Sequence, residues 1–172
     1  MRSLKRIILI VVVLVLGVLL TPKSAVDSLK NTVINFVEEG EKQQVEFVYA
    51  IDGDTAVFMV NGKEESIRFL SINCPEYTSS KEKWGKEATE FTKSVLKNAK
   101  TIEIEKDHMA MDRDNYDRLL RWVWVDGQLI EELLVSNSLA SVSYTNGQYK
   151  YDKRLMSLEE EAKQAKTGIW SE

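Results

Sequence analysis

Residues 50–76 read AIDGDTAVFMVNGKEESIRFLSINCPE, and this segment carries the clearest structural signals in the chain. Apolar runs predict one strand over residues 55–60 and another over residues 65–72. Asn61-Gly62 joins them, and Asn-Gly between two such runs is the strongest short signal for a β-hairpin. We therefore expect a tight antiparallel pair with polar residues just before its first strand and just after its second.

Those polar residues suggest a chemistry. Hard cations such as Ca²⁺ take oxygen ligands, which Asp54 and the side-chain amide of Asn73 can supply. The guanidinium of Arg68 matches the geometry of a phosphate. The carboxylate of Glu76 could hold or deprotonate a water molecule. Each residue alone is more often a solvated charge, but together they are typical of a calcium-dependent phosphodiesterase.

The ordered set of motifs resembles the thermonuclease family, also called staphylococcal or micrococcal nuclease. The resemblance extends over residues 45–172. It rests on Asp-Gly-Asp-Thr at 52–55, Arg-Phe-Leu at 68–70, Pro-Glu at 75–76, Tyr-Asp-Arg at 116–118 and Gly-Ile-Trp at 168–170.

The resemblance implies a Ca²⁺ site. Asp54 would bind the ion directly, while Asn73 and the backbone carbonyl of Cys74 occupy the positions of the other protein ligands. Asp52 would support these ligands without touching the ion. The family has aspartate where this chain has Asn73, so one negative charge is lost and we expect weaker Ca²⁺ binding. Cys74 replaces a threonine, which should matter little because only its carbonyl is used.

The resemblance also implies the reacting groups. Glu76 would orient or deprotonate the attacking water, and Arg68 and Arg118 would stabilise the five-coordinate phosphorus. Tyr116 and Tyr144 would line the nucleotide pocket. Family members cleave DNA and RNA at the 5′ oxygen and leave 3′-phosphates. We therefore expect a nucleic-acid substrate. We also expect the protein to be a monomer.

Three further departures from the family pattern affect this site. Asp117 stands where the family often has glycine, and its carboxylate could pair with Arg118 and weaken phosphate binding. Aspartate does tolerate left-handed turns better than most residues. The lysine-bearing loop at residues 77–83 is about three residues shorter than in the family. A second tyrosine of the pocket is replaced by Asn146.

The remaining patterns predict an α+β domain. Short strands with interleaved helices fit the OB fold, a five-stranded Greek-key β-barrel, here with three helices. The family resemblance implies the same architecture. Beyond the hairpin, we expect strands at 45–51, 101–105 and 119–125, and helices at 86–97, around 129–134 and around 155–165.

Composition is that of a globular protein, with 44% hydrophobic and 29% charged residues. Cys74 is the single cysteine, so no intrachain disulfide is possible. The net charge of −4 does not fit a general nucleic-acid coat protein, which would be basic. It is compatible with a nuclease that has a local positive site, and it predicts weak non-specific binding elsewhere.

The first 25 residues read as a targeting segment. Arg2, Lys5 and Arg6 precede an unbroken apolar run over residues 7–20. The run favours a cleavable signal peptide by its length, whereas the sequence after it favours an uncleaved signal-anchor helix, and both interpretations stay open. Either one places the rest of the chain outside the cytoplasm, secreted or held at the membrane.

Residues 26–44 have apolar positions at helical spacing followed by acidic residues, and we interpret them as an amphipathic spacer before the domain at 45–172.

Two other functions compete with that of a nuclease. One is a catalytically weak or inactive OB-fold module that binds nucleic acid or protein, because a fold does not fix a function. The other is a membrane-anchored adaptor.

Overall fold

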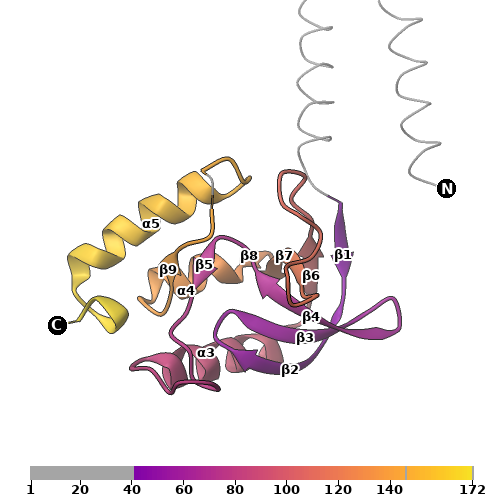
Figure 1. Ribbon diagram of the computed structural model, residues 1–172, viewed down its shortest axis with the longest axis horizontal. Helices are drawn as coiled ribbons and strands as arrows, with labels where there is room; N and C mark the ends of the chain where they lie inside the picture. Colours follow the sequence, from indigo (N-terminus) through magenta and orange to yellow (C-terminus); the bar gives the residue numbers. More distant parts are fainter. Residues whose placement is uncertain (1–40, 146, 172) are drawn as a thin grey trace, which may run out of the picture. The chain divides into compact units, whose positions relative to one another are not determined.

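The computed structural model describes residues 41–145 and 147–171 (Figure 1). This part of the chain forms a mixed sheet, a small second sheet and three α-helices. The strands are β1 (Lys42–Gln44), β2 (Glu46–Asp52), β3 (Thr55–Val60), β4 (Lys63–Phe69), β5 (Ile72–Asn73), β6 (Ile102–Glu105), β7 (Leu119–Val125), β8 (Gln128–Leu129) and β9 (Ser141–Val142). The helices are α3 (Gly85–Asn98), α4 (Ile130–Ser136), α5 (Asp152–Ala165) and the short 3₁₀-helix η1 (Gly168–Trp170).

The main sheet has the strand order β1-β6-β7-β4-β3-β2, with β8 added to β7. Neighbours are antiparallel except β4 and β7, which are parallel. Among the described residues β1 and β2 do not pair with each other, so the predicted five-stranded barrel is not closed by a complete hydrogen-bonded ring. The two end strands are consecutive in the chain and change partner at Val45, whose N–H donates to the carbonyl of Ile102 (3.0 Å).

The predicted hairpin is confirmed. Asn61 and Gly62 have φ angles of 51° and 79°, and both are therefore in the left-handed region that a tight two-residue turn between β3 and β4 requires. This turn sets a register in which Thr55 lies opposite Arg68. The register matters for the site because it brings the end of β4 beside the residue that precedes β3.

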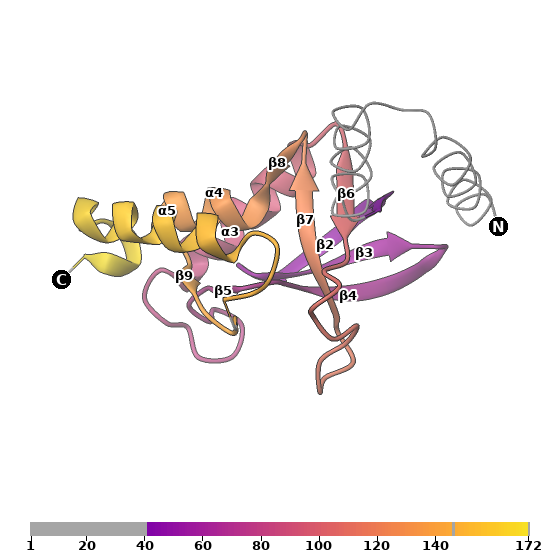
Figure 2. The ribbon, with the colours of Figure 1, turned by 90° about the horizontal axis from the view of Figure 1, so that it is seen from above.

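The helices cover the strands and complete the core. Figure 2 shows α4 and α5 gathered on one side of the crossing strands, while the loop between β6 and β7 projects away from them. The helix α3 buries Ala88, Thr92 and Leu96 and packs against β2. The largest fully buried side chains include Phe58 and Trp122.

Some boundaries differ from the expected ones. The helix α5 begins at Asp152, ahead of the expected start around residue 155, and ends at Ala165 as expected, where Lys166 follows in a left-handed conformation. The polar residues of β1 were expected in the spacer, because their sequence carries no apolar signal, but they pair with β6. Residues 1–25 and most of the spacer lie outside the described residues. No helix among those described is long and apolar enough to cross a membrane.

Candidate active site

A cleft of about 1030 Å³ opens where β4 and β5 meet the loops that precede β7 and follow β9. Two further candidate residues, Asp54 and Cys74, are buried beside it, at 3% and 1% exposure. The predicted site residues that line the cleft itself are Arg68, Asn73, Glu76, Tyr116, Arg118 and Tyr144.

Asp54 and Arg68 form a buried ion pair at the floor of the cleft. Because β3 and β4 pair in the register described above, the backbone N–H of Phe69 donates to the carbonyl of Asp54 (2.9 Å). The Arg68 Nη2 lies 3.1 Å from the Asp54 Oδ2, and the backbone N–H of Cys74 donates to the same oxygen (2.7 Å). The hydroxyl of Thr55 donates to Oδ1 (3.1 Å). The Asp54 carboxylate is thus held in one orientation by three donors.

The same guanidinium nitrogen also reaches Asn73, donating to its Oδ1 at 3.3 Å. The carboxylate of Asp54 and the amide of Asn73 are oxygen donors of the type that Ca²⁺ takes, so the donor set fits such a cation. Arg68 holds the place between them in this structure, and a cation there requires Arg68 to turn away. Within residues 41–145 and 147–171, no cluster of three or more His, Cys, Asp or Glu side chains could hold a metal.

Glu76 stands on the loop after β5, with its carboxylate accepting a hydrogen bond from Ser79 (3.3 Å). Partial burial raises the pKa of Glu76, and the nearby carboxylates of Asp52 and Asp54 raise it further. A carboxylate whose pKa moves toward neutrality is a better general base than an ordinary one. Glu76 therefore has a suitable environment for accepting a proton from water.

Asp52 fixes the loop that carries Glu76. Its Oδ1 accepts hydrogen bonds from the backbone N–H groups of Tyr77 (3.2 Å) and Thr78 (3.0 Å) and from the Thr78 hydroxyl (2.6 Å). The intervening Gly53 allows this close packing, because a Cβ there would lie only 2.7 Å from the Cβ of Ala88 on α3. Asp52 thus supports the site from behind, through the backbone.

Arg118 immediately precedes β7 and is held by a carboxylate that the sequence did not suggest. Its Nε and Nη2 both lie 2.7 Å from the Oδ2 of Asp114. Burial alone would raise the pKa of Asp114, but hydrogen bonds from the backbone and side chain of Arg118 lower it. Asp117, expected as a partner of Arg118, instead lies 3.6 Å from Arg113 and adopts a φ of 65°. The left-handed turn is as expected, and the partner is different.

Two exposed tyrosines flank the arginines. Tyr116 and Tyr144 are 82% and 77% exposed. The guanidinium of Arg118 lies 5.3 Å from the Tyr116 ring centre, and that of Arg68 lies 5.6 Å from the Tyr144 ring centre. Both rings are therefore available for stacking on a ligand at the mouth of the cleft.

The loop that carries Tyr144 is tied down by a second unexpected carboxylate. Asp152 is fully buried at the start of α5 and accepts hydrogen bonds from the hydroxyls of Ser71 (2.6 Å) and Thr145, and from the backbone N–H of Tyr149 (2.9 Å). It links the corner after β4 to the residue next to Tyr144. Asp152 was not identified from the sequence, because its partner Ser71 lies on a distant segment of the chain.

Comparison with known proteins places this arrangement in a family. The profile described as "Staphylococcal nuclease homologue" matches residues 66–172. The chain is 30% identical over 138 residues to "Thermonuclease" of Staphylococcus hyicus, covering 78% of this chain and 80% of that protein.

Two relatives from Bacillus subtilis are each 36% identical over 126 residues, or 71% of this chain: "Endonuclease YncB", of which 59% is covered, and "SPbeta prophage-derived endonuclease YokF", of which 42% is covered. The chain thus spans only about half the length of these two relatives. The matching profile and the extensive match to the Staphylococcus hyicus protein show that this chain belongs to the staphylococcal nuclease family.

Proposed function

We propose that this protein is a Ca²⁺-dependent nuclease that hydrolyses phosphodiester bonds of DNA, RNA or both outside the cytoplasm. The observation that carries the proposal is the cleft, in which two arginines with carboxylate partners and a glutamate of raised pKa face the same space. Family membership and the names of the relatives support the same reaction class.

Each residue of the cleft has a different role in hydrolysis. Glu76 accepts a proton from the attacking water. The guanidinium groups of Arg68 and Arg118 donate hydrogen bonds to the non-bridging oxygens of the phosphate and stabilise its growing negative charge. The rings of Tyr116 and Tyr144 stack against the nucleotide. By the family pattern, the 5′ oxygen leaves and the product retains a 3′-phosphate.

Arg68 has two competing partners in this scheme. In the structure it neutralises Asp54, whereas in the substrate complex it faces the phosphate. The carboxylate of Asp54, the amide of Asn73 and the carbonyl of Cys74 would hold Ca²⁺, which when bound supplies Lewis-acid stabilisation of the phosphate. An amide in place of a carboxylate predicts a weak site that requires a high concentration of Ca²⁺.

The proposed location rests on the basic residues and apolar run of the first 25 residues. A secreted or membrane-held nuclease would meet nucleic acid outside the cell and Ca²⁺ at higher concentration than in the cytoplasm. We expect the protein to act as a monomer.

One observation favours a second candidate, a module that binds nucleic acid without cleaving it. The Arg68 guanidinium lies within hydrogen-bond distance of both Asp54 and Asn73 and so takes the place of a cation. A chain in which that contact persists with substrate would bind phosphate poorly at Arg68 and would not turn over.

The substitution Glu76→Gln tests the proposed function. It keeps the size of the side chain and removes the base, so we expect cleavage of single-stranded DNA to fall by about 10²–10⁴-fold. Glu87→Gln, on the exposed face of α3, is the matched control and should retain full activity. Undiminished cleavage by Glu76→Gln would exclude Glu76 as the base, and absence of cleavage by the wild type would favour the binding module.

A further inference from the structure

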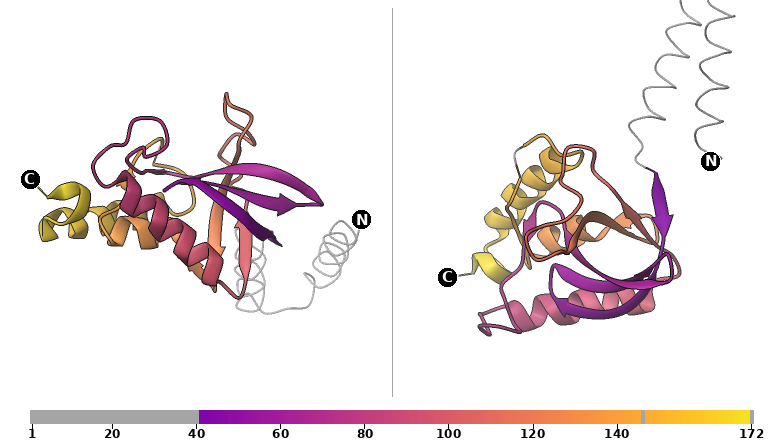
Figure 3. Two further views of the ribbon diagram at one scale, coloured as in Figure 1. Left: turned by 90° about the horizontal axis from the view of Figure 1, so that it is seen from below. Right: turned by 45° about the vertical axis from the view of Figure 1, so that its right-hand side comes forward.

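A second hollow lies on the other side of the loop that carries Glu76. It is a groove of about 1000 Å³ between β2 and α3. The main sheet ends at β2, and α3 packs beside this last strand (Figure 3), so residues of the edge strand and of the helix bound the groove. None of the residues assigned to hydrolysis lines it.

The groove is basic, although the chain as a whole is acidic. Four lysines and two glutamates line it, for a net charge of +2, whereas the whole chain carries −4. Lys93 and Lys97 lie one helical turn apart on α3 and therefore project from the same face. The other two basic residues are Lys81, on the loop before α3, and Lys100, just after α3.

Most of this charge is not neutralised within the protein. In the part of the chain that the structure describes, Lys81, Lys97 and Lys100 take part in no side-chain ion pair. Lys93 has only a long contact of 3.7 Å with Glu90, and both side chains are more than half exposed. Such an exposed pair contributes little to stability and leaves the lysine available to an external anion.

The groove also offers apolar and aromatic surface. Tyr49 on β2 is 51% exposed, and Val48 beside it is 38% exposed. Proteins that bind single-stranded nucleic acid combine a positive groove, which follows the phosphates, with aromatic rings on which bases stack. The lysines and Tyr49 provide both elements.

One short loop separates the groove from the cleft. Glu76 and Ser79 line the cleft, while Tyr77 and Thr78 between them line the groove. The loop is held to β2 by a hydrogen bond from the Thr78 hydroxyl to the carbonyl of Ile51 (2.8 Å). A polymer that leaves the cleft across this loop therefore enters the groove.

We propose that the groove between β2 and α3 is a second binding track for single-stranded nucleic acid, which holds the part of a long substrate that extends beyond the cleft. The occupant is a polyanion because most of the lysines in the groove have no ion-pair partner among the described residues. It is single-stranded because the exposed ring of Tyr49 can stack on an unpaired base, whereas both faces of a base inside a duplex are already covered. The proposal deepens the proposed function by assigning the enzyme a preference for long substrates over short ones.

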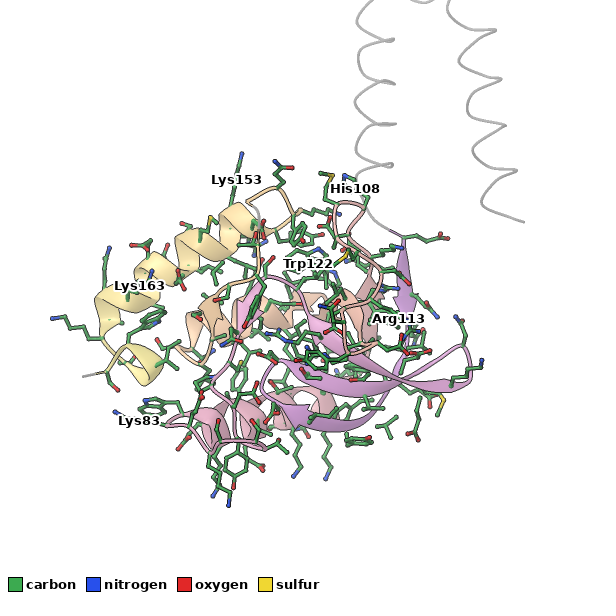
Figure 4. The ribbon with its side chains drawn as sticks, in the orientation of Figure 1. Lys83, His108, Arg113, Trp122, Lys153 and Lys163 are labelled. Atoms are coloured by element: carbon green, nitrogen blue, oxygen red, sulfur yellow. The ribbon has the colours of Figure 1, made fainter. Side chains whose placement is uncertain are left out.

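The test compares two double variants that remove the same charge. Lys93→Gln with Lys97→Gln changes the groove, and Lys86→Gln with Lys153→Gln is the control. Lys86 is an exposed residue of α3 that does not line the groove, and Lys153 points outward from α5 (Figure 4). Both pairs are introduced into the full-length chain carrying Glu76→Gln, so that binding is measured without cleavage.

Binding of a fluorescent single-stranded DNA of about 20 nucleotides, longer than the usual site of one OB fold, is followed by anisotropy over a range of salt concentrations. Each phosphate contact to a single strand contributes about 0.7 to the slope of log affinity against log salt, so the groove variant should lose about 1.4 of slope and roughly tenfold in affinity. The control and an oligonucleotide of about four nucleotides should change little.

Each outcome is decisive for the groove. An unchanged slope overturns the proposal, and an unchanged slope with an altered elution volume in size-exclusion chromatography assigns the groove to a second copy of the chain. The readout is binding, so a smaller salt slope in the groove variant would support the track even if the wild-type protein did not cleave DNA. If the wild-type protein cleaves DNA but the groove variant keeps its salt slope, the track is rejected and the proposed nuclease function still stands.

Discussion

The two arginines of the cleft have the same kinds of partner in different surroundings. The side chain of Arg68 is 10% exposed, pairs with the buried Asp54 and lies near Tyr144. The side chain of Arg118 is 29% exposed, pairs with Asp114 on its own turn and lies near Tyr116. The cleft therefore contains two guanidinium–carboxylate pairs, each beside an exposed tyrosine.

Because the two arginines differ in burial, we expect them to contribute differently to the stability of the fold. A buried ion pair that loses one member leaves an uncompensated charge in a medium of low dielectric constant, whereas a half-buried pair such as Arg118 and Asp114 can replace part of the lost contact with water. We infer that Arg68 serves both the fold and the phosphate, while Arg118 serves mainly the phosphate. Variants of the two arginines and of their neighbours test this distinction.

The first prediction compares Arg68→Ala with Arg118→Ala. Both should lower cleavage by about 10²–10³-fold, because each removes a donor to the charge that develops on the phosphate. Urea unfolding should separate them. Arg68→Ala should lose about 3 kcal/mol because Asp54 stays buried without its partner, and Arg118→Ala should lose less than about 1 kcal/mol. Equal losses of stability would show that burial does not distinguish the two arginines.

The second prediction concerns which carboxylate orients Arg118. Asp114→Asn removes the charge that both Nε and Nη2 of Arg118 contact, so kcat should fall by roughly tenfold, as for loss of a positioning residue. Asp117→Asn is the control, because its side chain is 88% exposed and faces Arg113. Rates measured with saturating DNA should rank the two variants, and a larger effect of Asp117→Asn would contradict the structure.

The third prediction tests whether Asn73, which lies beside Arg68, is a ligand of Ca²⁺. Asn73→Asp restores a negative charge next to Asp54, so the Ca²⁺ concentration for half-maximal cleavage should fall severalfold, because Ca²⁺ affinity depends on ligand charge. Asn115→Asp adds the same charge on an exposed loop near the cleft and should not move the midpoint. If both variants shift it equally, the effect is long-range electrostatics and Asn73 is not a ligand.

The fourth prediction uses Glu131, a buried carboxylate without a cationic partner among the described residues. Burial raises its pKa well above 4.5, although hydrogen bonds from its own backbone N–H and that of Val123 lower it. Between pH 4.5 and the native pKa, the folded state keeps a proton that the unfolded state has released, so stability falls as pH rises through this window.

Glu131→Gln is neutral at every pH and should remove that decline. Unfolding free energies from urea titrations between about pH 5 and 8 should therefore fall less steeply for the variant than for the wild type. Glu87→Gln, at an exposed position, serves as control. Parallel curves for wild type and Glu131→Gln would show that Glu131 is ionised in the folded protein.

Much of the site could be predicted from the sequence because its parts are local. The Asn61-Gly62 turn sets the register that brings Arg68 to Asp54, and the residues after β4 are close in the chain to both. The partner of Arg118 could not be predicted in this way. Asp114 and Asp117 are both close to Arg118 in the chain, and the sequence does not show that Asp114 contacts the arginine while Asp117 faces Arg113.

Contacts between residues far apart in the chain could not be predicted from the sequence either. Asp152 lies 81 residues from Ser71, and only the packing of α5 against β9 brings them together. The net charge of −4 predicted weak binding of nucleic acid outside the site, yet total charge cannot reveal that four lysines meet in one groove.

The most direct measurement is cleavage of single-stranded DNA by the purified full-length chain, titrated with Ca²⁺ from micromolar to millimolar concentrations, with a chelator as control. A Ca²⁺-dependent nuclease predicts cleavage that rises with Ca²⁺, disappears in the chelator and leaves 3′-phosphate ends. A folded protein that binds DNA but does not cleave it at any Ca²⁺ concentration would contradict the account and identify a binding module in which Arg68 keeps its contacts with Asp54 and Asn73.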